Sequence, residues 1–181
     1  MSARAALRAA TAAEHERVDR LFSSADLGAI DGYRRFLVAQ AAAFLPIEAA
    51  LEAAGAAQVL ADWPQRRRSH LLRADLAALE AVEPAPVAAP CFPGEAAILG
   101  GVYVLEGSRL GAAVLKRGVA AAAPTDFLSA PQEPGSWRKL LENLDRVLYG
   151  PDQIGAAVGA ARTVFEGFAA GGLRHLETAK A

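Results

Sequence analysis

The chain has 181 residues, of which 53% are hydrophobic, and its 19 basic side chains nearly balance its 20 acidic ones. This length is enough for one buried core, so we expect a single domain over residues 1–181. The balanced charge leaves no basic excess to neutralise a phosphate backbone, which argues against a nucleic-acid partner.

The single cysteine, Cys91, excludes an internal disulfide. The first residues include arginines where a secretory signal would have an apolar core, so we expect a cytoplasmic protein. In the most apolar segment, residues 94–118, Glu106 and Arg109 interrupt the run before it reaches the roughly 18 uncharged residues of a membrane helix. We therefore expect no membrane span.

Alanine is the commonest residue, and runs of β-branched or aromatic residues are scarce, so the sequence predicts an all-α fold. Apolar periodicity and the positions of proline and glycine predict helices over residues 3–22, 32–54, 63–81, 94–118, 136–149 and 151–176.

Local signals predict where several of these helices begin and end. Asp31 and Ser136 are candidate N-caps, and Pro151 suits the first turn of the last helix. Gly55 is expected to stop the second helix. The three arginines at 66–68 are expected on a solvated face of the third helix.

The segment 94–118 reads GEAAILGGVYVLEGSRLGAAVLKRG, with interior glycines that each cost a helix about 1 kcal/mol relative to alanine. Gly107 and Gly111 are four residues apart and share one face, where the backbone is open to close approach. Another helix packed tightly on this face is the interpretation that spacing alone favours. The alternative is a flat ligand pressed against the helix.

His15 shares a face of the first helix with Arg4, Arg8 and Asp19. A neutral imidazole could ligate iron through one ring nitrogen while Asp19 holds the other N–H and fixes the tautomer. Arg4 and Arg8 could meet carboxylates of the same ligand. Taken alone, the pattern more often describes an ordinary histidine in an ion-paired helix.

Two motifs together resemble the bacterial haem oxygenases. LRxxTxxxHxxxD spans residues 7–19, YVLEGSxLG spans residues 103–111, and their order and spacing also resemble the family. The resemblance continues through residues 44–48, 66–76 and 137–144, and so covers most of the chain.

The resemblance implies a single all-α domain that holds haem between the first, proximal helix and a kinked, glycine-rich distal helix. It implies that haem, as both substrate and cofactor, is cleaved with O2 to biliverdin, CO and Fe2+. His15 takes the position of the proximal iron ligand, supported by Asp19. Gly107 and Gly111 match the distal glycines, and Ser108 is placed to order distal water.

Arg8 is the best candidate to hold the haem propionates, and Lys116, Arg117 and Arg162 are weaker candidates. An external ferredoxin, flavodoxin or NAD(P)H-dependent reductase must supply electrons, because the chain carries no flavin or iron–sulfur motif. The basic run at 66–68 is a candidate docking site for such an acidic donor.

Two departures from the family pattern leave other functions open. Ala112 replaces the second glycine of the usual GSxLGG, and Ala12 stands where some relatives place a cation near the haem edge. The alternative function is a non-catalytic haem carrier or sensor of the same fold. A helical protein that binds no haem is a third.

Overall fold

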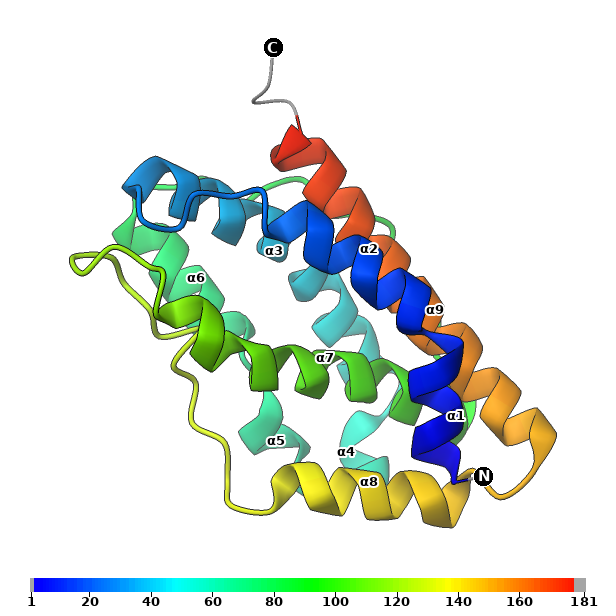
Figure 1. Ribbon diagram of the computed structural model, residues 1–181. Helices are drawn as coiled ribbons and strands as arrows, with labels where there is room; N and C mark the ends of the chain where they lie inside the picture. The colour runs from blue at the N-terminus through cyan, green and yellow to red at the C-terminus, as the bar shows by residue number, and fades with distance from the viewer. Residues whose placement is uncertain (1, 178–181) are drawn as a thin grey trace.

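The computed structural model describes residues 2–177, and every regular element among them is a helix, which confirms the all-α fold (Figure 1). The helices are α1 (Ala3–Ala10), α2 (Ala12–Phe22), α3 (Ile30–Ala53), α4 (Ala56–Val59), α5 (Trp63–Arg66), α6 (Ser69–Ala78), α7 (Gly94–Lys116), α8 (Ser136–Val147) and α9 (Pro151–His175).

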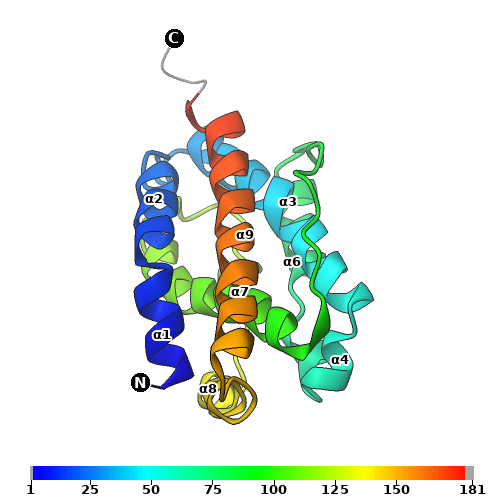
Figure 2. The same ribbon diagram turned by 90° about the vertical axis from the view of Figure 1, so that its right-hand side faces the viewer.

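The last helix, α9, is the scaffold on which the others are arranged. It packs against α7, α3, α2 and α1, and Figure 2 shows it between the α1–α2 pair on one side and α3 on the other. Glycines allow its closest contacts: a Cβ at Gly100 of α7 would lie 2.1 Å from the Ala157 carbonyl oxygen, and one at Gly171 would lie 2.6 Å from the Ala39 carbonyl oxygen.

The helix predicted over residues 3–22 is broken at Thr11, where φ is −115° and ψ is 8°. The buried Thr11 hydroxyl donates a hydrogen bond of 2.8 Å to the carbonyl of Leu7, one turn earlier. Such back-bonding by threonine bends or interrupts helices. The first predicted helix is therefore two segments, α1 and α2.

Two of the predicted N-caps are wrong by one or two positions. Ala29 caps α3, and Asp31 lies in its first turn, where it pairs with Arg34. Gly135, with φ of 80°, caps α8, and Ser136 is the first residue of that helix. Gly55, with φ of 93°, does end the second predicted helix.

The prediction for the third helix and its arginine run is also wrong. The chain forms α5 and α6, separated at Arg67 and Arg68, and the side chains of Arg66 and Arg68 are buried, with only 5% and 1% of each residue exposed. Arg66 pairs with Asp62 and Glu106, and Arg68 donates to the Leu105 carbonyl and the Ser108 hydroxyl. Burial without such partners would be prohibitive. Only Arg67 remains outside, 3.6 Å from Glu52.

Among residues 2–177, α3 and α7 are long and apolar enough to cross a membrane. Their most apolar windows are 61% and 56% buried within the protein, as in the core helices of soluble proteins. Glu106 and Arg109, which interrupt this apolar run in the sequence, are buried and paired with each other. The absence of a membrane span stays a prediction.

Candidate haem site

His15 and Asp19 lie next to each other on the exposed side of α2. The His15 Nδ1 atom is 3.1 Å from the Asp19 Oδ2 atom, and 62% of the His15 side chain is exposed. The ring of Phe165 on α9 meets the imidazole edge-on, with ring centroids 5.8 Å apart. Asp19 and Phe165 thus orient the ring and leave Nε2 as the nitrogen available to a ligand.

The four interior glycines of α7 form two pairs with different surroundings. A Cβ at Gly101 would lie 2.5 Å from the Phe92 ring, and Gly100 is equally confined, whereas a Cβ at Gly107 or Gly111 would meet nothing within 4 Å. The interpretation of Gly107 and Gly111 as a tight helix-packing face is therefore wrong.

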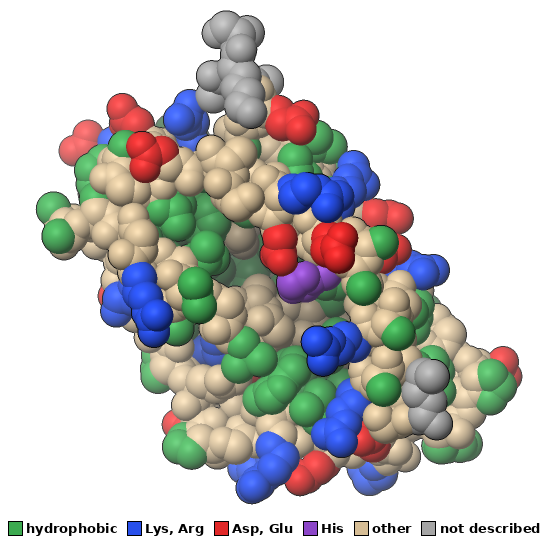
Figure 3. All heavy atoms as spheres, viewed as in Figure 1, with side chains coloured by type: hydrophobic (Ala, Val, Ile, Leu, Met, Phe, Trp, Pro, Cys, Tyr) green, Lys and Arg blue, Asp and Glu red, His purple; other side chains and the backbone are tan. Residues whose placement is uncertain are grey.

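The open face of α7 is apolar. Leu110 and Val114, which follow Gly107 at helical spacing, are 47% and 67% exposed. Figure 3 shows the molecule hollowed between α2 and α7, with hydrophobic side chains in and around the hollow and charged side chains along its α2 side. The two helices that border this hollow are therefore α2, which carries His15, and α7, which carries the open glycine face.

Arg8 of α1 lies near Tyr103, which is on the same face of α7 as Gly107. Burial raises the pKa of Tyr103, and the positive charge of Arg8 opposes that rise. The Tyr103 ring is stacked on Trp137 of α8, with centroids 5.7 Å apart. A cation of α1 and a phenol of α7 therefore lie near each other.

No family model matches the chain. A haem oxygenase of Xanthomonas campestris pv. campestris (strain 8004) is 33% identical over 112 residues, which are 59% of this chain and 67% of that protein. The chain belongs to the bacterial haem oxygenase family. The haem oxygenase of Neisseria meningitidis, solved with NO and CO bound, superposes with a TM-score of 0.81 at 22% identity, over 98% of this chain and 93% of that one. This likeness shows the haem oxygenase fold.

Within this haem oxygenase fold, the departure at Ala112 does not reach the open face of α7. Ala112 is 3% exposed, so its methyl group points into the core, whereas Gly111 is exposed beside it. Ala12 is exposed on α2.

Ser108 is engaged by its own helix and by Arg68. Its hydroxyl donates a hydrogen bond of 2.7 Å to the Leu105 carbonyl and accepts one of 3.0 Å from Arg68 Nη2. Its one hydrogen is already used, so Ser108 can order a distal water only by accepting a hydrogen bond from it.

Arg68 is the most deeply buried cation of this region. Its guanidinium lies 4.9 Å from the ring centroid of Phe44 and 5.1 Å from that of Phe127. Burial lowers its pKa to about 9, opposed by the charges of Glu106 and Glu48. Through its bond to the Leu105 carbonyl, Arg68 links the start of α6 to α7 two residues before Gly107.

A second buried cluster surrounds Glu106 of α7. Glu106 accepts hydrogen bonds from Arg66 Nη1 at 2.9 Å and Arg109 Nε at 3.3 Å. Arg109 also donates to the carbonyls of Arg66 and Pro131, at 2.6 and 2.8 Å. The sequence analysis missed this cluster as part of the site, although charged residues within an apolar helix were a signal for it.

The remaining predicted cations divide by their contacts. Arg4 lies 3.9 Å from Asp145 of α8. Arg162 donates to the Ala10 carbonyl and pairs with Glu14, so the Nε and Nη2 atoms of its guanidinium already have partners within the protein. Lys116 and Arg117 are exposed at the end of α7. Arg8 is exposed on α1, near Tyr103.

The other histidines belong to other helices. His70 is exposed on α6. His175 is the last residue of α9, where burial lowers its pKa and disfavours the cation. Within residues 2–177 no three His, Cys, Asp or Glu side chains gather as a metal site, so any iron bound there would rely on one imidazole.

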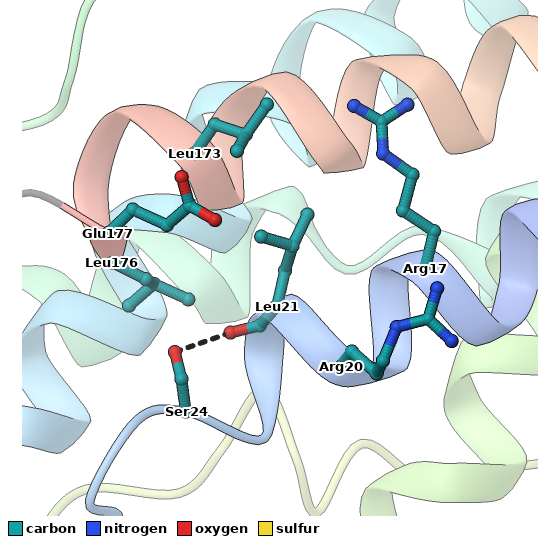
Figure 4. A pocket seen from close by; sticks show the side chains of 7 residues that line it. All are labelled: Arg17, Arg20, Leu21, Ser24, Leu173, Leu176 and Glu177. Atoms are coloured by element: carbon teal, nitrogen blue, oxygen red, sulfur yellow. Dashed lines mark hydrogen bonds between the residues drawn. The ribbon is translucent and has the colours of Figure 1, made fainter.

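A separate pocket of ≈ 490 Å³ lies between α2 and the end of α9 (Figure 4). It is lined by Arg17, Arg20, Leu21, Ser24, Leu173, Leu176 and Glu177. Arg17 and Leu21 lie on the opposite side of α2 from His15, because they follow it by two and six residues. This pocket is not part of the hollow beside α7.

Proposed function

We propose that this protein is an active haem oxygenase, which cleaves haem to biliverdin, CO and Fe2+ with O2 and electrons from an external donor. The observation that supports this most strongly is the open glycine face of α7. Interior glycines weaken a helix, and here Gly107 and Gly111 accommodate no neighbouring side chain that would account for them. A flat ligand pressed against the backbone accounts for them.

The residues around the hollow fit haem. His15 would hold the iron through Nε2, with Asp19 keeping Nδ1 protonated. Haem would supply both the iron that activates O2 and the porphyrin that is oxidised. A neutral imidazole lacks the electron push of a thiolate that favours O–O cleavage, and Cys91 lies exposed in a loop.

On the distal side, Gly107 and Gly111 would let the macrocycle approach the backbone of α7 and leave room for O2. Leu110 and Val114 would cover its apolar surface, and this burial would favour binding. Arg8 and Tyr103 would meet the propionates with a positive charge and a phenol hydroxyl.

The electrons must come from another protein, because haem cleavage is an oxidation driven by O2 and reductant. A ferredoxin, a flavodoxin or an NAD(P)H-dependent reductase would supply them, in the cytoplasmic location that the sequence predicts. Docking through the basic run at 66–68 is ruled out for Arg66 and Arg68, whose guanidinium groups are inside the protein.

The decisive experiment is reconstitution of the purified protein with one equivalent of haem, followed by ascorbate under air with catalase present. Catalase removes free hydrogen peroxide, so loss of the Soret band then reports turnover by the protein. We expect the Soret band to disappear while a biliverdin band grows and CO is released. A stable Soret band would contradict the proposal and favour the haem carrier or sensor.

A further inference from the structure

The break between α1 and α2 is bridged from the other side by α9. The carbonyl of Ala10, the last residue of α1, accepts hydrogen bonds from Arg162 Nε at 3.2 Å and Arg162 Nη2 at 2.8 Å. The same Nε atom lies 3.0 Å from Glu14 Oε1, in the first turn of α2. One guanidinium thus touches the end of one helix and the start of the next.

The break lies between the two groups that would contact haem from this side. Arg8 is three residues before Thr11, and His15 is four residues after it. In a continuous helix the spacing of these residues would be set by helical geometry alone. Here the direction of α1 relative to α2 decides where Arg8 lies with respect to His15.

Arg162 and the ring that packs on His15 come from the same face of α9. Arg162 and Phe165 are three residues apart, and Phe165 meets the imidazole edge-on at 5.8 Å. This face of α9 therefore touches both the break and the candidate iron ligand. Local unfolding of the break would loosen both at once.

We propose that Arg162 is a positioning residue for haem: its fork on Ala10 and Glu14 fixes the angle between α1 and α2 and thereby the separation of His15 from Arg8. The proposal rests on the proposed function for its haem partner. It replaces the expectation that Arg162 binds a propionate itself. An exposed ion pair adds little to global stability, so the role is local.

The first measurement uses the protein without haem. Amide hydrogen exchange is followed at Thr11 and His15, whose N–H groups donate to the carbonyls of Leu7 and Thr11 and so flank the break on its two sides. In Arg162→Leu we expect exchange at these amides to rise roughly tenfold, the effect of losing a charge-assisted hydrogen bond. Glu14→Gln keeps the contact to Ala10 and should raise exchange much less.

The second measurement uses the haem complex. Arg162→Leu should weaken haem binding several-fold and shift the iron–histidine stretching band in the Raman spectrum, and Arg162→Lys, which cannot make the two-pronged contact, should restore this only in part. Arg174→Leu is the matched control, because Arg174 is also on α9 and also donates a hydrogen bond to a backbone carbonyl, that of Ala85. It should leave both readouts unchanged.

The outcomes separate the two proposals. If the wild-type protein binds haem but Arg162→Leu has normal exchange at Thr11 and His15 and a normal Raman band, the role of Arg162 is overturned and the proposed function stands. If the wild-type protein binds no haem, the proposed function fails, and the role of Arg162 toward haem fails with it.

Discussion

The Nδ1 atom of His15 lies 3.1 Å from the Oδ2 atom of Asp19, one turn further along α2. Both side chains are about two-thirds exposed, so a simple surface ion pair would contribute little to stability. The pair gains importance if His15 is a metal ligand, because a carboxylate on one ring nitrogen makes the other nitrogen a better ligand. The open glycine face of α7 is the second feature that fits a haem site.

Asp19→Asn should weaken haem binding by about 10- to 100-fold, the usual effect of losing a carboxylate behind a ligating histidine. The asparagine amide fills the same space, so the melting temperature of the haem-free protein should not change. Haem titration followed at the Soret band measures the affinity. Equal affinity in wild type and variant would show that Asp19 does not support the ligand.

His15→Ala should remove the imidazole-ligated haem spectrum and all turnover, while folding is retained because the side chain is exposed. His70→Ala is the control, since His70 is exposed on another helix. Absorption and electron paramagnetic resonance spectra of the ferric complexes provide the comparison. An unchanged spectrum in His15→Ala would refute the ligand assignment.

Gly111→Phe should block turnover without destabilising the haem-free protein, because a Cβ there meets nothing within 4 Å. Gly111→Ala should stabilise the helix by about 0.5–1 kcal/mol and slow oxygenation by stiffening the distal backbone. Thermal melting of the haem-free variants is measured beside turnover.

Gly100→Ala is the contrasting variant, since its Cβ would lie 2.1 Å from the Ala157 carbonyl oxygen, and it should lower the melting temperature strongly. If Gly111→Phe proved as destabilising as Gly100→Ala while keeping activity, Gly111 would be a packing residue after all.

Glu106→Gln should destabilise the protein by roughly 3–5 kcal/mol, because it leaves the buried guanidinium groups of Arg66 and Arg109 without their shared carboxylate. Urea unfolding of the haem-free protein measures this. Glu16→Gln removes only an exposed pair with Arg20 at 3.8 Å and should change stability by less than about 0.5 kcal/mol. Similar midpoints for the two variants would contradict the importance of the buried cluster.

Arg8→Ala should alter haem orientation more than folding, since loss of a charge-assisted contact to a propionate removes roughly 1.5–3 kcal/mol of positioning energy. The expected result is weaker affinity or a changed ratio of biliverdin isomers, separated by chromatography. In the haem-free protein the pKa of Tyr103 should rise further, because the cation that lowers it is gone. A tyrosine titration by NMR tests this second effect, and unchanged values in both would place the propionates elsewhere.

The amino-acid sequence by itself determined the helical class, most helix boundaries and the identity of the candidate site residues. Gly55 and Pro151 act within one turn of their own position, and apolar periodicity is a property of a single segment. The two haem oxygenase motifs, around His15 and around Gly107 and Gly111, are likewise continuous stretches of chain, so they could be recognised without a fold.

Only the tertiary structure decided which charged residues are buried, what bridges the break in the first helix and what lies opposite the glycines. Arg66 turns inward to meet Glu106, which is 40 residues away in the sequence. Arg162 likewise donates to the carbonyl of Ala10, which is 152 residues away. Gly100 and Gly107 look alike in sequence, yet one is pressed against α9 and the other faces open space. Such contacts depend on which helices pack together, and no local pattern encodes that packing.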